Sequence, residues 1–316
     1  MMSDVCVYIG EQLARYSFGN DHPFGPKRHD AFVKEFRRQH LHEKVKLREP
    51  CECDEEALLW FHTQEYIDKV KLLSQTGEGY LDGGDTPAFT GMYNIALTVV
   101  GTTLNALDVV MRGECTRAFI PIAGLHHARR DRAAGFCIFN DCGVAIEAAR
   151  NKYGLKKVAY VDIDAHHGDG VFYSFDTDPD LIFADLHEDG HYLYPGTGFE
   201  NETGQGKAEG TKLNIAMPMG AKDADFLRAW ARAEEFIRDG KPEIIFLQCG
   251  ADSLDGDPIT HMQYSEKAHA YATQQLMKVA DEFCEGRIIA MGGGGYNLDN
   301  LARAWCAVVN SFVKHR

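Results

Sequence analysis

The sequence is short of several features, and each shortage excludes a class of protein. Basic residues are in the minority, 33 against 47 acidic residues in a chain of 316, and the net charge of −14 argues against a nucleic-acid binder. No apolar stretch approaches the roughly 18 residues of a membrane span. The N-terminus lacks the basic start and apolar core of a signal peptide. We therefore expect neither nucleic-acid nor membrane partners.

Cysteine is present without any dense framework. The nine cysteines are scattered and odd in number, and Cys51-x-Cys53 has no second Cys or His pair near it. We read neither a disulfide scaffold nor a zinc finger from them. With no sign of secretion, we expect a cytoplasmic protein with reduced thiols.

What the sequence does contain is a regular alternation of short apolar strands and longer helices. We expect strands at about 5–9, 117–122, 158–163, 181–185, 213–216, 243–248 and 287–291. We expect helices at about 26–40, 87–111, 140–151, 223–239, 264–284 and the C-terminus, with one or two helices at 54–73. This pattern predicts an α/β fold with an open, mostly parallel sheet and helices on both faces. With no linker or repeat, residues 1–316 read as a single domain.

Polar clusters follow five of these strands, at 124–127, 162–170, 185–191, 250–257 and 292–296. Sites in such sheets lie beyond the carboxyl ends of the strands, so we expect the clusters to share one pocket. Helix 87–111 should begin with Thr86 as N-cap and Pro87 as its first residue. It is apolar nearly all round and should be buried.

The stretch 158–170, VAYVDIDAHHGDG, concentrates acids and imidazoles at the end of an apolar strand. Such a group would repel or go unpaired unless a cation binds it, although a hydrogen-bonded polar loop is the plainer alternative. Asp164 and His166 are two residues apart, so their side chains point the same way on extended backbone. A third ligand must come from elsewhere. Asp252 is the first candidate, with Asp255 and Asp257 as alternatives, to complete a three-ligand zinc site.

Two adjacent histidines, His126 and His127, are the candidates for acid–base catalysis. Each would need a carboxylate partner to set its tautomer. Asp162 and Asp169 are the two acids of the stretch 158–170 that are not predicted to bind the metal, so they are the candidate partners. A structural role, satisfied by ordinary hydrogen bonds, is the alternative.

Tyr296 follows a run of four glycines and could donate a hydrogen bond to a developing oxyanion. A plain glycine turn with an exposed tyrosine is the alternative. Phe136 and Tyr194 lie in loops at the edge of the expected pocket, where ordinary core packing explains either residue by itself.

Taken together, LHHA with GFC and ND, DIDAHHGDG, LHEDGHYLYPGTG, GADSLDGDP and GGGGY resemble, in this order, the zinc-dependent histone deacetylase superfamily. The N-terminal DHPFGPKR matches too, and the resemblance spans about residues 16–310. The motifs are most similar to those of the bacterial acetoin-utilisation deacetylases, a branch akin to class I enzymes. The resemblance implies an arginase-like open α/β fold and hydrolysis of acetyl-lysine.

The resemblance also assigns roles. It implies zinc ligands Asp164, His166 and Asp252, a general base His127 with His126 beside it, carboxylate partners Asp169 and Asp162, and Tyr296 to polarise the acetyl carbonyl. It implies substrate contacts from Gly135, Phe136 and Tyr194 in the tunnel, Ile259 at its mouth, Asp85 at the rim and Arg28 in the inner cavity where acetate leaves. It implies a potassium ion at Asp162, Asp164, His166, Asp185 and Leu186, partly through backbone carbonyls.

Two residues depart from the family pattern. Asp185 stands where serine is usual, and Asp141 where class I enzymes have asparagine. The first puts the potassium site in doubt, and we expect neither to touch the catalytic set.

The expected activity is a zinc amidohydrolase acting on an acetylated protein or a small acetylated amine such as an acetylpolyamine. A dimetal ureohydrolase-type enzyme and a non-catalytic acyl-lysine binder are the rivals, and metal counting separates the first of them. The acidic surface fits either cationic substrates or simple solubility. Acyl preference stays open, as does the oligomeric state, with a homo-oligomer among the expectations.

Overall fold

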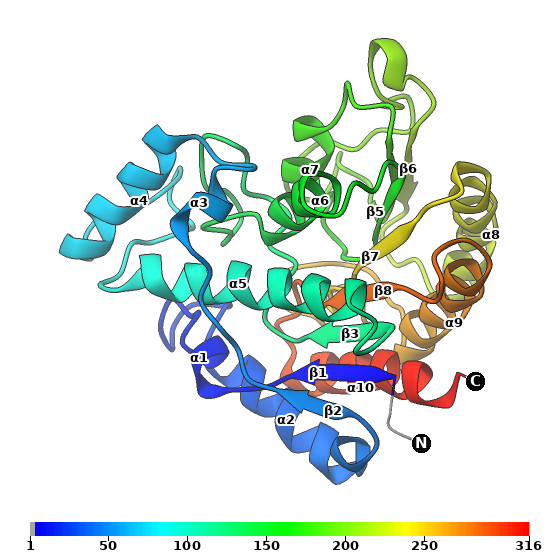
Figure 1. Cartoon of the computed structure of the whole chain (residues 1–316), viewed down its shortest axis with the longest axis horizontal. Coiled ribbons are helices and arrows are strands. Elements are labelled where there is room, and N and C mark those ends of the chain that lie inside the picture. Colours follow the sequence, from blue (N-terminus) through cyan, green and yellow to red (C-terminus); the bar gives the residue numbers. More distant parts are fainter. Residues whose placement is uncertain (1–3, 316) are drawn as a thin grey trace.

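The apolar strands form one parallel sheet in the computed structural model, which describes residues 4–315 (Figure 1). The strands are β1 (Val5–Tyr8), β2 (Lys46–Arg48), β3 (Arg117–Ile120), β4 (Val158–Asp162), β5 (Leu181–Glu188), β6 (Lys212–Met217), β7 (Ile244–Gln248) and β8 (Ile288–Met291). Their order is β2-β1-β3-β8-β7-β4-β5-β6, and each neighbouring pair is parallel. The fold class predicted from the sequence is confirmed.

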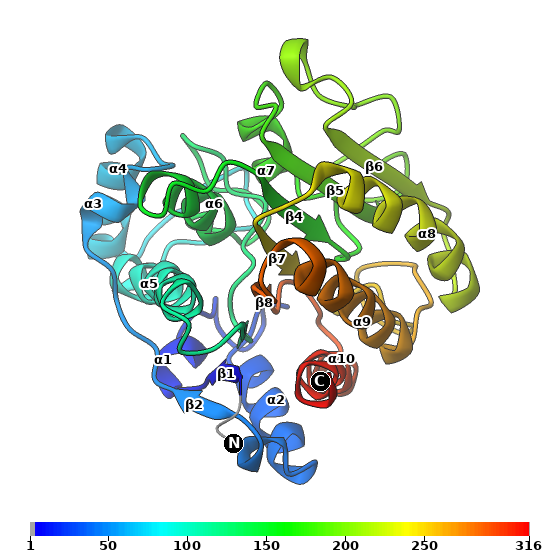
Figure 2. The same ribbon diagram turned by 45° about the vertical axis from the view of Figure 1, so that its right-hand side comes forward.

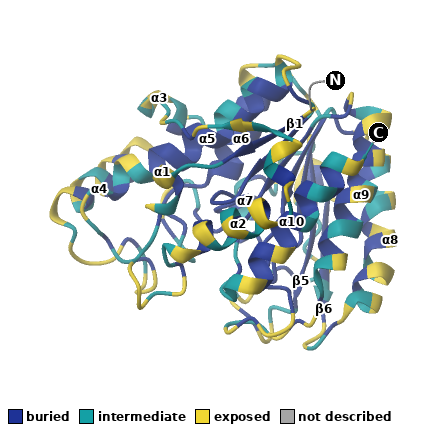
Figure 3. Ribbon diagram, turned by 90° about the horizontal axis from the view of Figure 1, so that it is seen from below, coloured by how far each residue is buried: buried dark blue, intermediate teal, exposed yellow. Residues whose placement is uncertain are grey.

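Helices cover both faces of this sheet. They are α1 (Glu11–Ala14), α2 (Lys27–Arg38), α3 (Glu55–Leu58), α4 (Gln64–Thr76), α5 (Met92–Met111), α6 (Asp141–Asn151), α7 (Asp169–Ser174), α8 (Asp223–Gly240), α9 (Glu266–Phe283) and α10 (Leu298–Lys314), with 3₁₀ turns at Leu41–Glu43 and Gly206–Ala208. Helices α5 and α6 pack together on one face, and α2, α10, α9 and α8 form a continuous layer on the other (Figure 2). Apart from the edge strand β2, which is partly exposed, the strands between the layers are buried, while the outer helix surfaces are exposed (Figure 3).

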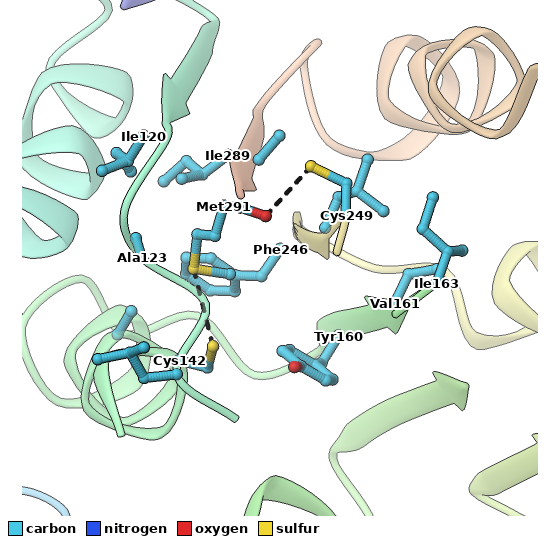
Figure 4. Packing of buried hydrophobic residues seen from close by; sticks show 14 of the residues in the cluster. Ile120, Ala123, Cys142, Tyr160, Val161, Ile163, Phe246, Cys249, Ile289 and Met291 are labelled. Carbon is cyan, nitrogen blue, oxygen red and sulfur yellow. Dashed lines mark hydrogen bonds between the residues drawn. The ribbon is translucent and has the colours of Figure 1, made fainter. Parts of the chain in front are cut away.

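The centre of the sheet is apolar because strands buried on both faces need no polar side. β4, β7 and β8 are buried along their whole length. Below the site, Met291 of β8 contacts Cys142 of α6, and its carbonyl accepts a hydrogen bond from Cys249 Sγ at 3.1 Å (Figure 4). The strand ends therefore rest on a packed core that holds the following loops in place.

Helix α5 corrects two expectations. It begins at Met92 after Gly91, whose φ is 82°, and not at Pro87, because the Thr86 hydroxyl is used elsewhere. At 20 residues with a mean hydropathy of 1.4, it is also long and apolar enough to pass a compositional test for a membrane span. Within the protein, 67% of its apolar window is buried, as expected for a core helix.

Three further expectations differ from the structure. Gly240 lies inside α8, and Lys241 takes the left-handed position that ends the helix, with φ 50°. The edge strand β2 was not predicted, because three residues with two charges carry little strand signal. Cys6 and Cys115 form a disulfide with Cα atoms 6.2 Å apart, so the expectation of reduced thiols throughout is wrong for this pair.

Candidate metal centre and paired histidines

Four of the five predicted polar clusters meet in one cavity at the carboxyl edge of the sheet. The cavity is narrow, about 20 Å³, and is lined by Phe24, Gly124, Leu125, His126, His127, Gly135, Cys137, Asp164, His166, Asp252, Gly293, Gly294 and Tyr296. The fifth cluster, 185–191, does not line it. The expectation of one shared pocket is correct for segments following β3, β4, β7 and β8 and wrong for the segment at the end of β5.

Asp164, His166 and Asp252 form the one group of potential metal ligands found within residues 4–315. His166 Nδ1 lies 3.0 Å from Asp164 Oδ1 and 3.1 Å from Asp252 Oδ2. Two ligand atoms bound tetrahedrally to zinc at about 2.0 Å would be about 3.3 Å apart, so the spacing fits such an ion. The alternatives for the third ligand, Asp255 and Asp257, are outside this group.

The charges of the triad also fit a bound cation. Burial alone would lower the pKa of His166, but Asp252 and Asp164 raise it to about 10. Burial together with Asp164 raises the pKa of Asp252 to about 7. Both shifts arise from excess negative charge in a buried place, which a divalent cation would neutralise.

The two carboxylate ligands are also held in place by hydrogen bonds on the side away from His166. Asp164 Oδ2 accepts hydrogen bonds from Gln248 Nε2 and from the backbone N–H of Gly294, both at 2.9 Å, and Asp252 Oδ1 accepts one from Ala165 N at 2.9 Å. A Cβ atom at Gly294 would lie 2.1 Å from Asp252 Oδ2, so only glycine lets this loop approach the carboxylates.

The two histidines each have the carboxylate partner expected for them. His126 Nδ1 lies 2.8 Å from Asp162 Oδ2, and His127 Nδ1 lies 2.8 Å from Asp169 Oδ1. Their Nε2 atoms are 3.1 Å apart, within hydrogen-bond distance, so a proton on one ring can be donated to the other. A Cβ at Gly135 would lie 2.4 Å from His127 Cδ2, which explains glycine at this position.

The surrounding charges and burial give the two imidazoles different pKa values. Burial opposes protonation of His126, but Asp162 and Asp164 raise its pKa to about 9. Burial and the charge of His126 lower the pKa of His127 to about 4, against the opposing effect of Asp169. In the metal-free protein, His126 is therefore the more basic imidazole and His127 the less basic one, an arrangement typical of an acid and a base in one site.

Tyr296 lies at the wall of the cavity with its hydroxyl free for a ligand. Its backbone N–H donates to Asp257 Oδ2 at 2.8 Å, and its hydroxyl makes no hydrogen bond within residues 4–315. Burial raises the pKa of Tyr296 well above its ordinary value, so the hydroxyl keeps its proton. Asp257, an unused ligand candidate, therefore positions the loop that carries this tyrosine.

The two aromatic residues that were predicted to line the substrate tunnel pack against different residues of the site. The Phe136 ring packs edge-on against Tyr296 at 5.9 Å, and the Tyr194 ring packs against His127 at 5.1 Å. Phe136 holds a left-handed backbone with φ 66°, fixed by hydrogen bonds to Thr86 Oγ1 and from the Tyr16 hydroxyl. A strained residue held this firmly is typical of a functional site.

The remaining predicted substrate residues lie around this centre. Arg28 is buried behind the glycine loop, where its guanidinium donates to Gly295 O at 2.8 Å and Gly293 O at 2.6 Å, while Nη1 has no hydrogen-bond partner among residues 4–315. Asp85 lies outside the cavity on an exposed loop, and Ile259 follows Asp257, whose Oδ1 accepts its N–H at 3.1 Å.

The structure brings together the residues expected to bind potassium, and the Asp185 carboxylate among them already has two partners. Asp185 Oδ2 accepts a hydrogen bond from Gly168 N at 2.8 Å, and Asp185 Oδ1 lies 2.7 Å from His187 Nδ1. Burial and the charge of Asp185 raise the pKa of Asp162 to about 6, although His126 opposes this. Leu186 is buried on β5 beside them.

The expectation that neither departure from the family pattern touches the catalytic set is corrected for the charge of Asp185, whereas Asp141 contacts residues next to that set and not a member of it. Asp185 acts on Asp162, the partner of His126. Asp141 accepts hydrogen bonds from the backbone N–H groups of Gly124 and Leu125, directly before the two histidines.

Three supporting residues escaped the sequence analysis. Gln248 bonds Asp164, the Tyr160 hydroxyl donates to Asp162 Oδ2 at 2.7 Å, and Arg129 Nη2 donates to Asp169 Oδ2 at 2.9 Å. Gln248 could have been identified from the sequence, because it is the polar last residue of an otherwise apolar strand. Arg129 and Tyr160 had no signal beyond their proximity to the motifs.

A parallel α/β sheet with a candidate Asp-His-Asp metal site and two His–Asp pairs at its carboxyl edge is the arrangement of a hydrolase active site. The chain matches the histone deacetylase domain over residues 22–312 and belongs to that family.

Individual relatives agree with this assignment. The chain is 38% identical to the acetoin utilization protein AcuC of Bacillus subtilis (strain 168), over 97% of this chain and 81% of that protein. It is 33% identical to AcuC of Staphylococcus xylosus, over 97% and 82%. Its fold is similar to the crystal structure of the HDA15 HD domain, with a TM-score of 0.90, 26% identity, and coverage of 98% of this chain and 88% of that one.

Proposed function

We propose that the protein is a zinc-dependent amidohydrolase that removes acetyl groups from lysine side chains of proteins or from related amines. The observation that carries this proposal is the convergence of the Asp164-His166-Asp252 triad with His126, His127 and Tyr296 on one cavity. Membership of the histone deacetylase domain family supports the same chemistry.

Zinc held by Asp164, His166 and Asp252 would supply Lewis-acid activation of the attacking water and of the acyl oxygen. The protein's own groups then handle the protons. His127, neutral and oriented by Asp169, accepts the proton of the water as it adds to the acyl carbon. His126, charged and held by Asp162, supplies a proton through the pair as the carbon–nitrogen bond breaks and the amine leaves.

Two further residues complete the reaction. The Tyr296 hydroxyl donates to the acyl oxygen, which becomes negative only as water adds, so its contribution falls mainly on the transition state. The unpartnered Nη1 of Arg28 supports a role in binding the acetate carboxylate on the inner side of the site. Phe136 and Tyr194 would enclose the aliphatic stem of the substrate, with Gly135 giving room beside His127 and Ile259 at the mouth.

Potassium binding at Asp162, Asp164, His166, Asp185 and Leu186 is also proposed. The buried carboxylates of Asp162 and Asp185 favour a cation there, whereas the contact between Asp185 and His187 opposes one. A comparison of thermal unfolding in potassium and lithium salts would decide this point.

The test of the main proposal is metal content measured together with acetate release. Purified protein loaded with zinc should retain about one equivalent, the stoichiometry of a three-ligand catalytic site, and should release acetate from a capped acetyl-lysine amide. Asp252→Ala should lose both metal and activity. Two equivalents of metal in the active protein would favour a dimetal enzyme, and zinc retention with no acetate release would favour an acyl-lysine binder.

A further inference from the structure

Lys212 is the one buried lysine within residues 4–315, with 1% of its surface exposed, and the proposed reaction does not use it. It is the first residue of β6, which lies beside β5 at one end of the sheet (Figure 2). Because the strands are parallel, Lys212 lies at the amino edge of the sheet, opposite the metal centre. A buried ammonium costs free energy unless its donors are satisfied, so its surroundings need an explanation.

Three neutral oxygens surround this ammonium. Lys212 Nζ donates to the backbone carbonyls of Asp178 at 2.8 Å and Leu181 at 2.9 Å, and to Thr211 Oγ1 at 2.7 Å. The Thr211 hydroxyl gives its own proton to Ala208 O at 2.7 Å, which leaves its oxygen free to accept. An ammonium has three donors, so these three acceptors satisfy it completely.

The ring of oxygens holds a positive charge without an acidic partner. Lys212 forms no ion pair within residues 4–315, and the Asp178 carboxylate binds Arg150 and the backbone N–H of Asp180 instead. Burial lowers the pKa of Lys212 to about 8, although Asp178 opposes the shift, so the side chain is still charged near neutral pH. Rings of carbonyl oxygens replace the hydration shell of monovalent cations in proteins, whereas divalent ions prefer sites with carboxylates.

The ring also joins the loop between α7 and β5 to the loop before β6. Across this contact, the backbone N–H of Gln205 donates to Asp176 O at 2.7 Å. Gly204, with φ 100°, covers the lysine stem, and a Cβ atom there would lie 3.2 Å from Lys212 Cγ. A positive charge at the centre of the contact therefore holds the two loops together.

We infer that this ring is a site for a monovalent cation, and that the protein fills it with the ammonium of its own Lys212. A potassium or ammonium ion would enter the ring only when the lysine side chain is cut back. The ring shares no residue with the potassium site proposed around Asp162, and it takes no part in the proposed deacetylase reaction.

The experiment measures the melting temperature of the full chain in potassium, ammonium and lithium chlorides at equal ionic strength, with the much smaller lithium ion as reference. Lys212→Ala removes the ammonium and opens space for an ion, whereas Lys212→Met removes the ammonium and keeps the space filled. Lys157→Ala is the matched control, because Lys157 Nζ donates to Pro179 O of the same loop at 3.1 Å but is 42% exposed. Subtracting the wild-type response to each salt removes any effect of the potassium site around Asp162.

In lithium, both Lys212 variants should melt on the order of 5 °C below the wild type, because buried carbonyls lose their donor. Lys157→Ala should stay within about 2 °C, the effect of an exposed contact. Potassium or ammonium should restore much of the loss in Lys212→Ala as its concentration rises, and none of it in Lys212→Met.

Equal salt responses of Lys212→Ala and Lys212→Met overturn the inference, as does a response of Lys212→Ala no larger than that of Lys157→Ala. Lys212→Ser is a second variant that leaves room for an ion. If neither it nor Lys212→Ala folds in potassium or ammonium salts, an ion cannot replace the lysine and the inference is rejected.

Discussion

Replacing Tyr296 with phenylalanine removes one hydroxyl from the proposed catalytic site and little else. The hydroxyl makes no hydrogen bond within the described chain, and the ring keeps its packing against Phe136 at 5.9 Å. The backbone N–H of residue 296 keeps its bond to Asp257. We therefore expect the variant to fold normally and to retain zinc, because Tyr296 is not a ligand.

The rate of turnover should fall steeply. Loss of one donor to a developing oxyanion typically costs about 10²–10³ in kcat, or roughly 3–4 kcal/mol of transition-state stabilisation. Because the interaction strengthens only as water adds, KM should change much less than kcat. The assay is steady-state acetate release from a capped acetyl-lysine amide, with zinc content and melting temperature measured on the same preparations.

Tyr192→Phe is the matched control. Tyr192 is 63% exposed on a neighbouring loop and does not line the cavity, so its hydroxyl should be dispensable. Near-wild-type turnover by Tyr296→Phe would refute the oxyanion role, and the glycine run before it would then be a structural turn.

Three further variants test other parts of the reasoning. His127→Ala should lower kcat by about 10²–10⁴ through lost proton transfer, and elemental analysis should find zinc still bound. Asp257→Ala leaves the N–H groups of Tyr296 and Ile259 unpaired and should cost about 1–3 kcal/mol in denaturant unfolding, with unchanged stability contradicting the assigned contacts. Burial lowers the pKa of His62 to about 3, so the unfolded chain alone binds this proton as pH falls from about 6.5. The free energy of unfolding should therefore fall by up to about 1.4 kcal/mol per pH unit from this group, and a His62→Gln variant with the same slope would disprove it.

The parts of the fold that the sequence predicts are those where one strong local pattern agrees with the tertiary structure. β4, β7 and β8 are continuous apolar runs, and the polar residues after them could only converge at the carboxyl edge of a parallel sheet. Asp164 and His166 could be predicted as a pair of ligands from the sequence because they are only two residues apart. Asp252 needed the matching position after another strand.

The errors arose where distant contacts outcompete local signals. Thr86 and Pro87 look like a helix start, but the Thr86 hydroxyl accepts the N–H of Phe136, fifty residues away in sequence. Arg129 was missed because its link to Asp169 is visible only once the two segments are folded together. Such contacts carry no periodicity, so no single-sequence pattern contains them.

The strand order has a consequence for how the chain folds. β3 pairs with β8, although about 170 residues separate them in sequence (Arg117 with Ile288), and β8 also pairs with β7. The N-terminal strands β2, β1 and β3 thus have no link to the rest of the sheet until β8, the last strand, enters between β3 and β7 (Figure 1). During synthesis, the open edge of β3 must wait for the C-terminal segment, which makes late, slow closure of the sheet the expected course of folding.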